Sequence, residues 1–393
     1  MAEWIECKIS DIGTVIGGAT PSTKKPENYE NGTIAWITPK DLSTFTGRYI
    51  QRGERNITEI GLKSCSTQLL PKDTVLFSSR APIGYVAIAA NEVCTNQGFK
   101  SVVPNENTDP LFLYYLLKYN KDKIEGMGSG TTFKEVSGNT MKNIVVSVPT
   151  DKKVQKRISS MLGSIDDKIE ENERINNNLE QQAQAIFANE FLSLDTLPEG
   201  WKQAGLIDIA DYLNGLAMQK YRPTADEIGI PVLKIKELRQ GCCDDNSELC
   251  SPNIKSDYII HDGDVIFSWS GSLLVDLWCG GICGLNQHLF KVTSSKYDKW
   301  FYYAWTKHHL DRFVAVAADK ATTMGHIKRD ELAKAEVLIP NEADYNRIGA
   351  LLQPMYEMII SNRIENKKLA VTRDTLLPKL MNGEIDMSEV DYE

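Results

Sequence analysis

The stretch "SGTTFKEVSGNTMKNIVVSVP" at residues 129–149 has a second version in the same chain, "KATTMGHIKRDELAKAEVLIP" at residues 320–340. Both run from a Thr-Thr pair through a polar helical turn into a short apolar strand that ends at a proline, Pro149 or Pro340. Self-similarity at a long, fixed separation is the mark of a repeated structural unit. The echo therefore predicts that most of this 393-residue chain is one fold built twice.

Further matches extend the repeat over nearly the whole chain. Their offset drifts only from 197 to 188 residues, so a few changes in loop length account for it. The matching pairs are "WIECKISDI" (4–12) with "WKQAGLIDI" (201–209), "IAWITPKDL" (34–42) with "IPVLKIKEL" (230–238), "DTVLFS" (73–78) with "GDVIFS" (263–268), "TNQGFKSV" (95–102) with "LNQHLFKV" (285–292), and "LYYL" (113–116) with "FYYA" (301–304).

Each copy is predicted to be a mixture of short strands and turns with a helix. Short β-branched or aromatic runs predict strands at 34–38, 74–77, 85–89 and 144–148. A helix is predicted over 109–119, where Asp109 can cap and Pro110 suits the first turn. Each copy is therefore expected to be an α+β domain of about 150 residues, within the usual size range of domains.

A long polar helix is predicted after each domain. Apolar and asparagine positions recur there in steps of four and three, which is the heptad pattern of a coiled-coil seam. The predicted seam comprises Ile158, Leu162, Ile165, Ile169, Asn172, Asn176 and Leu179 in the first helix, and Ile348, Leu352, Met355, Ile359, Asn362, Asn366 and Leu369 in the second.

Both seams are interrupted by an asparagine pair at the same place. A seam asparagine lowers stability but fixes register, because it needs a polar partner. We therefore predict that the helices pack antiparallel on each other, with Asn172 and Asn176 near Asn362 and Asn366. A helix of about 35 residues spans roughly 50 Å, so the pair would act as a spacer between two domains. The alternative is two independent surface helices.

Composition and charge fit an ordinary globular protein, with 42% hydrophobic and 25% charged residues. The net charge of -9 argues against a uniformly basic nucleic-acid binder. The acid excess lies in the two predicted helical regions, each with 6 basic and 10 acidic residues over 151–200 and 341–393. Without a signal peptide or an apolar run of 18 residues, the chain is expected to be cytoplasmic with its eight cysteines reduced.

Taken together, these segments resemble the specificity subunit of type I restriction-modification systems. The resemblance rests on the duplicated domains, on "FSSRAPIGYVA" and "TNQGFKSV", on "SGTTFKEVS" leading to "VSVP", on the helix "QKRISSMLGSIDDKIEENERINNNLEQQAQAIF", and on the terminal "TLLPKLMNGEI". Each motif is weak alone, whereas their order and duplication are specific.

The resemblance implies an α+β fold with two tandem target-recognition domains, separated by two long helices that form an antiparallel coiled coil with pseudo-two-fold symmetry. The implied boundaries are 1–150 for the first recognition domain, 151–197 for the central helix, 198–340 for the second recognition domain, and 341–393 for the distal helix and tail.

It also implies a non-catalytic subunit that recognises double-stranded DNA. Each domain would read one half of a bipartite, asymmetric site, and the helices would dock two adenine-N6 methyltransferase subunits. Two restriction (helicase-nuclease) subunits would complete the complex. S-adenosylmethionine, ATP and Mg would belong to those partners. The chain has no Asn/Asp-Pro-Pro-aromatic motif and no G-x-x-x-x-G-K-[ST] loop, in agreement with this expectation.

Candidate DNA contacts are basic, amide, hydroxyl or aromatic side chains in turns, because phosphate contacts position a protein and base contacts specify a sequence. For each, a merely solvated or structural role is the alternative. In the first copy they are Lys24, Lys25, Arg48, Arg80, Gln97, Thr131, Thr132 and Lys134; in the second they are Lys220, Arg222, Trp269, Ser270, Gln287, Lys320, Thr322, Thr323 and Lys328. Asn96 and Asn286 are expected to brace strand ends.

Other chemistries are weakly supported. The glycines of "GMGSGTT" (126–132) carry no lysine of a nucleotide loop, and the five histidines show no pattern of a hydrolytic triad. Cys242, Cys243, Cys250, Cys279 and Cys283 fit no common zinc spacing, so no metal site is predicted. A duplicated protein-binding adaptor with a coiled-coil spacer is the main alternative function.

Overall fold

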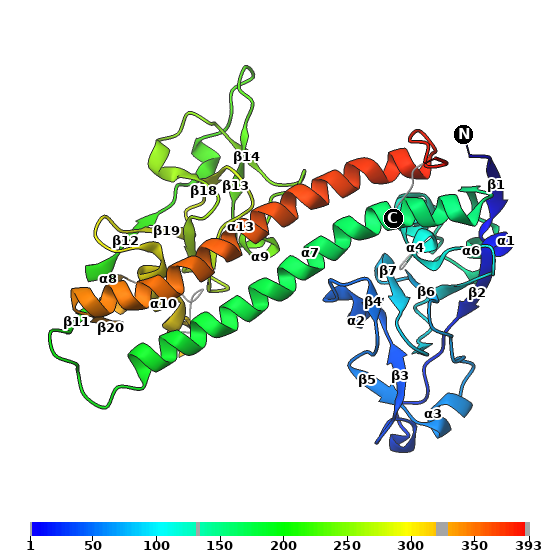
Figure 1. The fold of residues 1–393 in the computed structure, drawn as a ribbon, viewed down its shortest axis with the longest axis horizontal. Helices are drawn as coiled ribbons and strands as arrows, with labels where there is room; N and C mark the ends of the chain where they lie inside the picture. The colour runs from blue at the N-terminus through cyan, green and yellow to red at the C-terminus, as the bar shows by residue number, and fades with distance from the viewer. Residues whose placement is uncertain (1, 131–133, 320–328, 390–393) are drawn as a thin grey trace. The chain divides into compact units, whose positions relative to one another are not determined.

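The structure is a computed structural model that describes residues 2–130, 134–319 and 329–389. The chain divides into two compact units, unit 1 (residues 1–170 and 369–393) and unit 2 (residues 171–368). The chain passes from one unit to the other at two points, one inside helix α7 (Lys152–Phe187) and one inside helix α13 (Glu342–Met381) (Figure 1). The linear domain boundaries given above remain predictions.

Unit 1 contains a five-stranded sheet, a three-stranded sheet and a two-stranded ribbon, in the orders β2-β9-β6-β7-β4, β5-β3-β8 and β1-β10. The strands are β1 (Trp4–Lys8), β2 (Gly13–Gly17), β3 (Ile34–Ile37), β4 (Tyr49–Ile50), β5 (Arg55–Ile57), β6 (Val75–Ser79), β7 (Ile83–Ala89), β8 (Cys94–Thr95), β9 (Lys100–Pro104) and β10 (Val145–Pro149). The helices before α7 are α1 (Ile9–Ile12), α2 (Pro39–Ser43), α3 (Glu59–Lys63), α4 (Pro110–Tyr119), α5 (Lys121–Gly126) and α6 (Gly138–Asn143).

Unit 2 repeats this plan with the sheets β12-β19-β16-β17 and β14-β13-β18-β15 and the ribbon β11-β20. Its strands are β11 (Lys202–Gly205), β12 (Asp211–Asn214), β13 (Ile230–Leu233), β14 (Leu249–Cys250), β15 (Ile259–Ile260), β16 (Val265–Ser268), β17 (Leu274–Leu277), β18 (Cys283–Leu285), β19 (Leu289–Thr293) and β20 (Glu336–Ile339). Its helices before α13 are α8 (Leu206–Ile209), α9 (Ile235–Gln240), α10 (Lys299–His308), α11 (Leu310–Asp319) and α12 (Arg329–Ala333).

The strand pairing shows that the two units share one topology. β2-β9-β6-β7 corresponds to β12-β19-β16-β17, with antiparallel neighbours throughout. The parallel pair β3-β8, in which Trp36 faces Cys94, corresponds to β13-β18, in which Val232 faces Gly284. The duplication predicted from the sequence echo is confirmed.

The elements predicted within the first copy are confirmed as well. β3, β6, β7 and β10 lie where apolar runs predicted strands, and α4 begins at Pro110. The Asp109 carboxylate caps α4 by accepting a hydrogen bond from the Phe112 amide at 2.8 Å. Sequence reasoning missed β1, the first strand, which pairs antiparallel with β10 from Trp4 opposite Pro149.

Each long helix contributes to the cores of both units. α7 starts in the core of unit 1 with Ile158 and Leu162, whereas its far end adds Ala183 and Phe187 to the core of unit 2. A π-helical turn, Ala188–Leu192, continues α7 and buries Phe191 in the same core. α13 does the converse, because it starts in unit 2 and ends in unit 1. No helix in the described residues is long and apolar enough to cross a membrane.

Five of the predicted seam residues are fully buried: Ile158, Leu162, Ile348, Leu352 and Ile359. They belong to the core clusters of the units, which contain side chains from both α7 and α13. The heptad spacing therefore also supplies the apolar face with which each helix lies on a domain core. Ile165, Ile169, Leu179, Met355 and Leu369 are partly buried.

The asparagine register is confirmed within unit 2. The Asn172 amide donates to Asn366 Oδ1 at 2.8 Å and to Glu365 at 2.7 Å, and the Asn362 amide donates to Asn176 Oδ1 at 2.9 Å. Along α7 the residue number increases from 172 to 176, while the number of the partner in α13 decreases from 366 to 362. The two helices therefore run antiparallel there. The same sense holds in unit 1, where Asp166 pairs with Arg373.

Candidate nucleic-acid interface

In unit 1, four connecting segments meet beside the ends of β2, β6, β8 and β9. Thr20, just after β2, shares a hydrogen bond with Gln97 in the turn between β8 and β9. The Ser79 amide at the end of β6 donates to the Gly98 carbonyl at 2.7 Å, and the Val136 amide donates to the Ser79 carbonyl at 3.0 Å. The segments around residues 18–21, 79–82, 96–99 and 129–130 with 134–136 thus form one loop cluster, which we call loop cluster 1.

Unit 2 brings together the corresponding segments, which we call loop cluster 2 and which comprise residues 214–217, 269–273 and 286–288. The Leu216 amide donates to the Leu285 carbonyl at 2.9 Å, and the Gln287 amide donates to the Leu216 carbonyl at 2.9 Å. The Trp269 indole donates to Asn214 Oδ1 at 3.0 Å. The segment that would correspond to 129–136 is 320–327, which lies outside the described residues.

A glycine permits the closest backbone approach in each cluster. A Cβ atom on Gly18 would lie 2.1 Å from the Thr95 carbonyl oxygen, and one on Gly215 would lie 2.2 Å from the Asn286 carbonyl oxygen. No side chain fits such a contact, because real Cβ atoms stay well beyond that distance. Asn96 and Asn286 brace these turns, as predicted: their Oδ1 atoms accept from the amides of Gly98 and His288.

The predicted contacts of unit 1 fall into three groups. Arg80, Gln97 and Lys134 come together in loop cluster 1, where Gln97 and Lys134 are exposed and Arg80 is half-buried. Lys24 and Lys25 are exposed on the long turn that follows Thr20. Thr131 and Thr132 lie outside the described residues.

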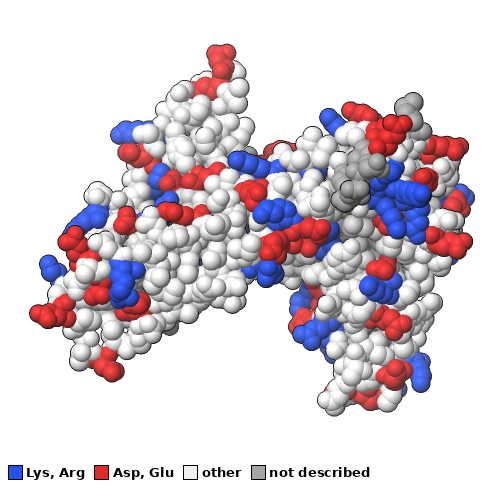
Figure 2. Space-filling model, in the orientation of Figure 1, with Lys and Arg blue, Asp and Glu red and all other residues white. Residues whose placement is uncertain are grey.

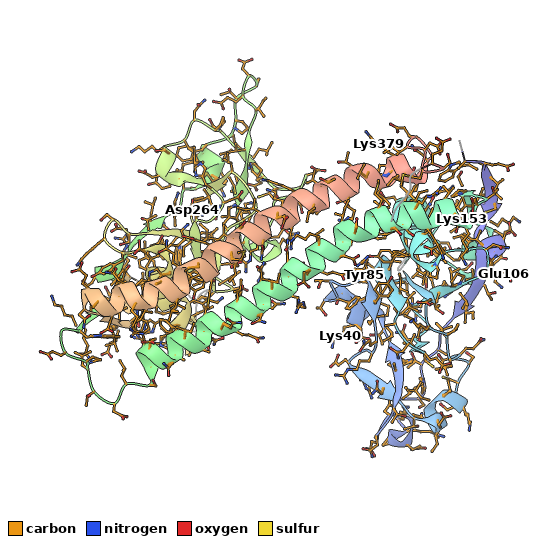
Figure 3. The ribbon with its side chains drawn as sticks, in the orientation of Figure 1. Lys40, Tyr85, Glu106, Lys153, Asp264 and Lys379 are labelled. Atoms are coloured by element: carbon orange, nitrogen blue, oxygen red, sulfur yellow. The ribbon has the colours of Figure 1, made fainter. Side chains whose placement is uncertain are left out.

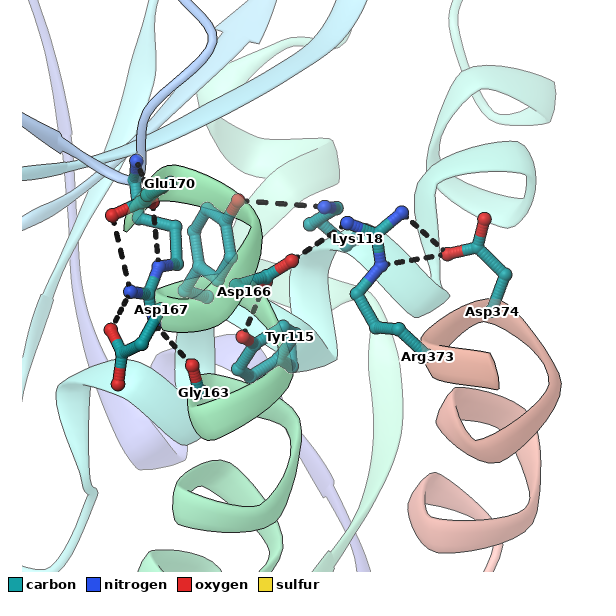
Figure 4. A network of polar contacts seen from close by, with 10 residues as sticks. Tyr115, Lys118, Gly163, Asp166, Asp167, Glu170, Arg373 and Asp374 are labelled. Atoms are coloured by element: carbon teal, nitrogen blue, oxygen red, sulfur yellow. Dashed lines mark hydrogen bonds and ion pairs between the residues drawn. The ribbon is translucent and has the colours of Figure 1, made fainter. Parts of the chain in front are cut away.

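Arg48 has a different role from the one predicted. Its side chain is 5% exposed, and its guanidinium donates to Glu170 at 3.0 Å, to Asp167 and to the Gly163 carbonyl at 3.2 Å, all on α7 (Figure 4). Burial opposes the charge, but the bonds to Glu170 and Asp167 outweigh it and raise the Arg48 pKa. A buried charge must be paired, so Arg48 anchors α7 and is removed from the candidate DNA contacts.

In unit 2, Trp269 and Gln287 come together in loop cluster 2. The Trp269 ring stacks on Phe290 with a centroid distance of 5.5 Å, and Gln287 lies 3.3 Å from the neighbouring His288 ring nitrogen. Lys220 and Arg222 are exposed, and Arg222 lies 3.6 Å from Glu248.

Ser270 is a further correction, because it is only 3% exposed. Its carbonyl accepts a bond from the Ser268 hydroxyl at 3.3 Å, so this residue shapes the β16-β17 hairpin. Lys320, Thr322, Thr323 and Lys328 lie outside the described residues.

Charge is not gathered into one continuous basic band on the face that Figure 2 shows, where basic and acidic side chains are interspersed over both units. At loop cluster 1, however, Arg80 and Lys100 both pair with a single carboxylate, Glu135. Loop cluster 2 instead presents the aromatic Trp269. The clusters have the same backbone plan and different side-chain chemistry.

Sequence reasoning missed a buried polar network in unit 1. The Tyr115 hydroxyl donates to Asp166 at 2.6 Å, and the other oxygen of Asp166 accepts from Arg373 at 2.7 Å (Figure 4). Burial first, and then the Asp166 carboxylate, raise the pKa of Tyr115. The network ties α4, α7 and α13 together. The only sequence signal was the position of Arg373, which follows the last seam residue, Leu369, by four residues and so places a charge where the heptad pattern continues.

The cysteines are unpaired, and the described residues hold no cluster of three or more metal-ligating side chains. Cys243 and Cys283 share a hydrogen bond that lowers the pKa of Cys243. Cys250 and Cys279 are buried elsewhere in unit 2.

The chain thus contains two tandem α+β domains, and each long helix contributes to both domain cores. Each domain presents one loop cluster. This arrangement is that of a duplicated recognition protein. The chain belongs to the type I restriction-modification DNA specificity domain family, whose model matches residues 1–181 and 198–370. It is a type I restriction-modification specificity subunit with two tandem recognition domains, as the resemblance implied.

Individual relatives agree with this family. The chain is 35% identical to the type I restriction enzyme MjaIX specificity subunit of Methanocaldococcus jannaschii over 99% of this chain and 95% of that protein. It is 20% identical to the HindI specificity subunit of Haemophilus influenzae over 98% and 100%. The crystal structure of a type I S subunit from M. genitalium has the same fold, with a TM-score of 0.61, 16% identity and coverage of 98% and 97%.

Proposed function

We propose that this chain recognises double-stranded DNA through loop clusters 1 and 2, each of which reads one half of a bipartite, asymmetric site. The observation that supports this most directly is the pair of matching loop clusters with different side chains, because two copies of one scaffold with different contacts suit two different half-sites. Arg80 and Gln97 in one cluster, and Trp269 and Gln287 in the other, are the proposed contacts, together with the exposed Lys24, Lys25, Lys134, Lys220 and Arg222.

We further propose that the chain itself is non-catalytic and works in a complex. Two adenine-N6 methyltransferase subunits would dock on the acidic surfaces of α7 and α13, and two restriction subunits would complete the assembly in the cytoplasm. S-adenosylmethionine, ATP and Mg would be bound by those partners. Near-neutral domains and acidic helices support a division of surface between DNA and protein.

Selection from a random duplex library tests the recognition step. The full-length chain, with its methyltransferase subunits, is expected to enrich a two-part sequence with a fixed gap. Binding should weaken as salt rises, with a slope near 0.9 per phosphate neutralised. Enrichment of a continuous palindrome, or of nothing, would contradict two separate readers.

Paired substitutions assign the half-sites. Arg80→Ala should reduce discrimination in one half only and lower the salt slope by about 1, whereas Trp269→Ala should act on the other half with the slope unchanged. Lys72→Ala is the matched control, because Lys72 is exposed ahead of β6, away from loop cluster 1 and from both long helices. Identical effects of Arg80→Ala and Trp269→Ala on both halves would argue against the assignment.

A further inference from the structure

Loop cluster 1 holds a carboxylate among its cations. Glu135 lies 3.6 Å from Arg80 Nη1 and 3.2 Å from Lys100 Nζ. The Lys100 ammonium also lies 3.4 Å from Ser79 Oγ. The side chains of Arg80 and Glu135 are 34% and 39% exposed, so both can be reached from solvent. An acid therefore occupies the place where the proposed function expects phosphate or base contacts.

Main-chain hydrogen bonds hold the backbone of Glu135 in place. The Glu135 amide donates to the Ser129 carbonyl at 2.9 Å, and the Ser129 amide donates to the Glu135 carbonyl at 3.0 Å. The next residue, Val136, is buried and bonded to Ser79, the neighbour of Arg80. Because main-chain bonds hold it on both sides, Glu135 is a defined part of the loop cluster.

The chemistry of a carboxylate points to two consequences. It repels phosphate and shares the charge of Arg80 and Lys100, which weakens sequence-independent attraction to DNA. An ionised carboxylate is also an acceptor only. On a base edge in the major groove it matches an exocyclic amino group, cytosine N4 being the regular partner. A base with a carbonyl oxygen at that place would be repelled.

We propose that Glu135 is a specificity-determining residue of unit 1. In the free chain its carboxylate pairs with Arg80 and Lys100. When a half-site presents an exocyclic amino group, the carboxylate accepts a hydrogen bond from that group, and Arg80 becomes available to bind DNA. This inference rests on the proposed function and adds a named residue and a base class to it. The second copy has His326 at the aligned position, so recognition of a base by a carboxylate at this position belongs to one half-site only.

The test compares the full-length chain and its Glu135→Gln variant by selection from the same random duplex library. We expect Glu135→Gln to lose about tenfold discrimination at one amino-bearing base of one half-site. Its affinity for unselected duplex should rise about threefold, as for removal of a surface ion pair. The other half-site should be unchanged. In an Arg80→Ala background, the gain in affinity for unselected duplex should shrink.

Glu106→Gln is the matched control. Glu106 is exposed just beyond the far end of β9, the strand that begins with Lys100 (Figure 3), and its substitution should change neither quantity. If wild type enriches a two-part sequence and Glu135→Gln enriches the same one with equal discrimination, this inference is wrong and the proposed function stands. Loss at both half-sites also overturns it. If wild type enriches no sequence, the proposed function fails, and this inference fails with it.

Discussion

Units 1 and 2 hold their exchanged helices by different means at the same topological place. In unit 1, Tyr115 bonds to Asp166, which pairs with Arg373. The register of the asparagine pairs relates Asp166 and Arg373 to Tyr356 and Ala183 of unit 2, and these two residues are buried there together with Tyr303 of α10. There the two tyrosine rings meet edge to face at 5.0 Å. One scaffold therefore accepts either a buried ion pair or an apolar contact, provided that every buried polar group has a partner.

Breaking the ion pair should have the largest effect. Asp166→Ala leaves the half-buried Arg373 with Asp374, which is 62% exposed, and should destabilise unit 1 by about 3 kcal/mol. Native-state hydrogen exchange, resolved by peptide, should show the loss in unit 1. Asp374→Ala should cost less than about 0.5 kcal/mol.

A double substitution tests the same comparison between the two units. Asp166→Tyr with Arg373→Ala gives α7 and α13 the side chains that unit 2 has at the corresponding helix positions, and should be more stable than Asp166→Ala alone, because no charge remains unpaired. A double variant less stable than Asp166→Ala would show that the two solutions are not interchangeable.

The hydroxyl groups of Tyr115 and Tyr303, which contact the corresponding positions Asp166 and Tyr356 on the long helices, should differ in importance. Tyr115→Phe removes a buried hydrogen bond to a carboxylate and should cost about 2 kcal/mol. Tyr303→Phe removes only a contact of 3.1 Å with Lys307, whose side chain is 42% exposed, and should cost less than about 1 kcal/mol. Chemical denaturation of both variants measures the difference; equal losses would remove the contrast between the units.

Breaking the hydrogen bonds of the asparagine register should lower the free energy of unfolding somewhat less than Tyr115→Phe does. Asn172→Leu removes the amide that Asn366 and Glu365 accept from, and should cost about 1–2 kcal/mol. Asn172→Leu with Asn366→Leu should cost less than the sum of the two single variants, since both polar groups are then replaced. Higher stability of each single variant with the helix pairing unchanged would refute the register hypothesis.

The smallest expected effect is pH-dependent and belongs to unit 2, since unit 1 contains no histidine. Burial lowers the pKa of His309 to about 4. The folded chain therefore binds this proton less tightly than the unfolded chain, and the stability contribution of His309 is lost as the pH falls from about 6.5 toward 4. Between pH 7 and pH 6 the loss should be below about 1 kcal/mol.

Hydrogen exchange of unit 2 across this pH range measures the effect. His309→Phe removes the titrating group and should flatten the dependence. A dependence that is unchanged in His309→Phe would assign the titration to another group.

The composition of the loop clusters was harder to predict than the scaffold. Residue type and position in turns singled out Arg80, Gln97 and Trp269 as candidates, and the structure places them in the loop clusters. Arg48 and Ser270 had the same sequence signals but are buried. Burial depends on what a distant segment covers, and for Arg48 that segment lies more than 110 residues away.

The sequence by itself determined the duplication, the principal strands, the cap of α4 and the asparagine register. Each of these follows from a local pattern or from a pattern repeated at a fixed offset, which one chain displays without reference to its fold. Only the tertiary structure decided which apolar helix residues belong to domain cores, how Asp166 meets Arg373 across 207 residues, and that Glu135 lies between Arg80 and Lys100. Those contacts join segments far apart in the chain, and no local spacing encodes them.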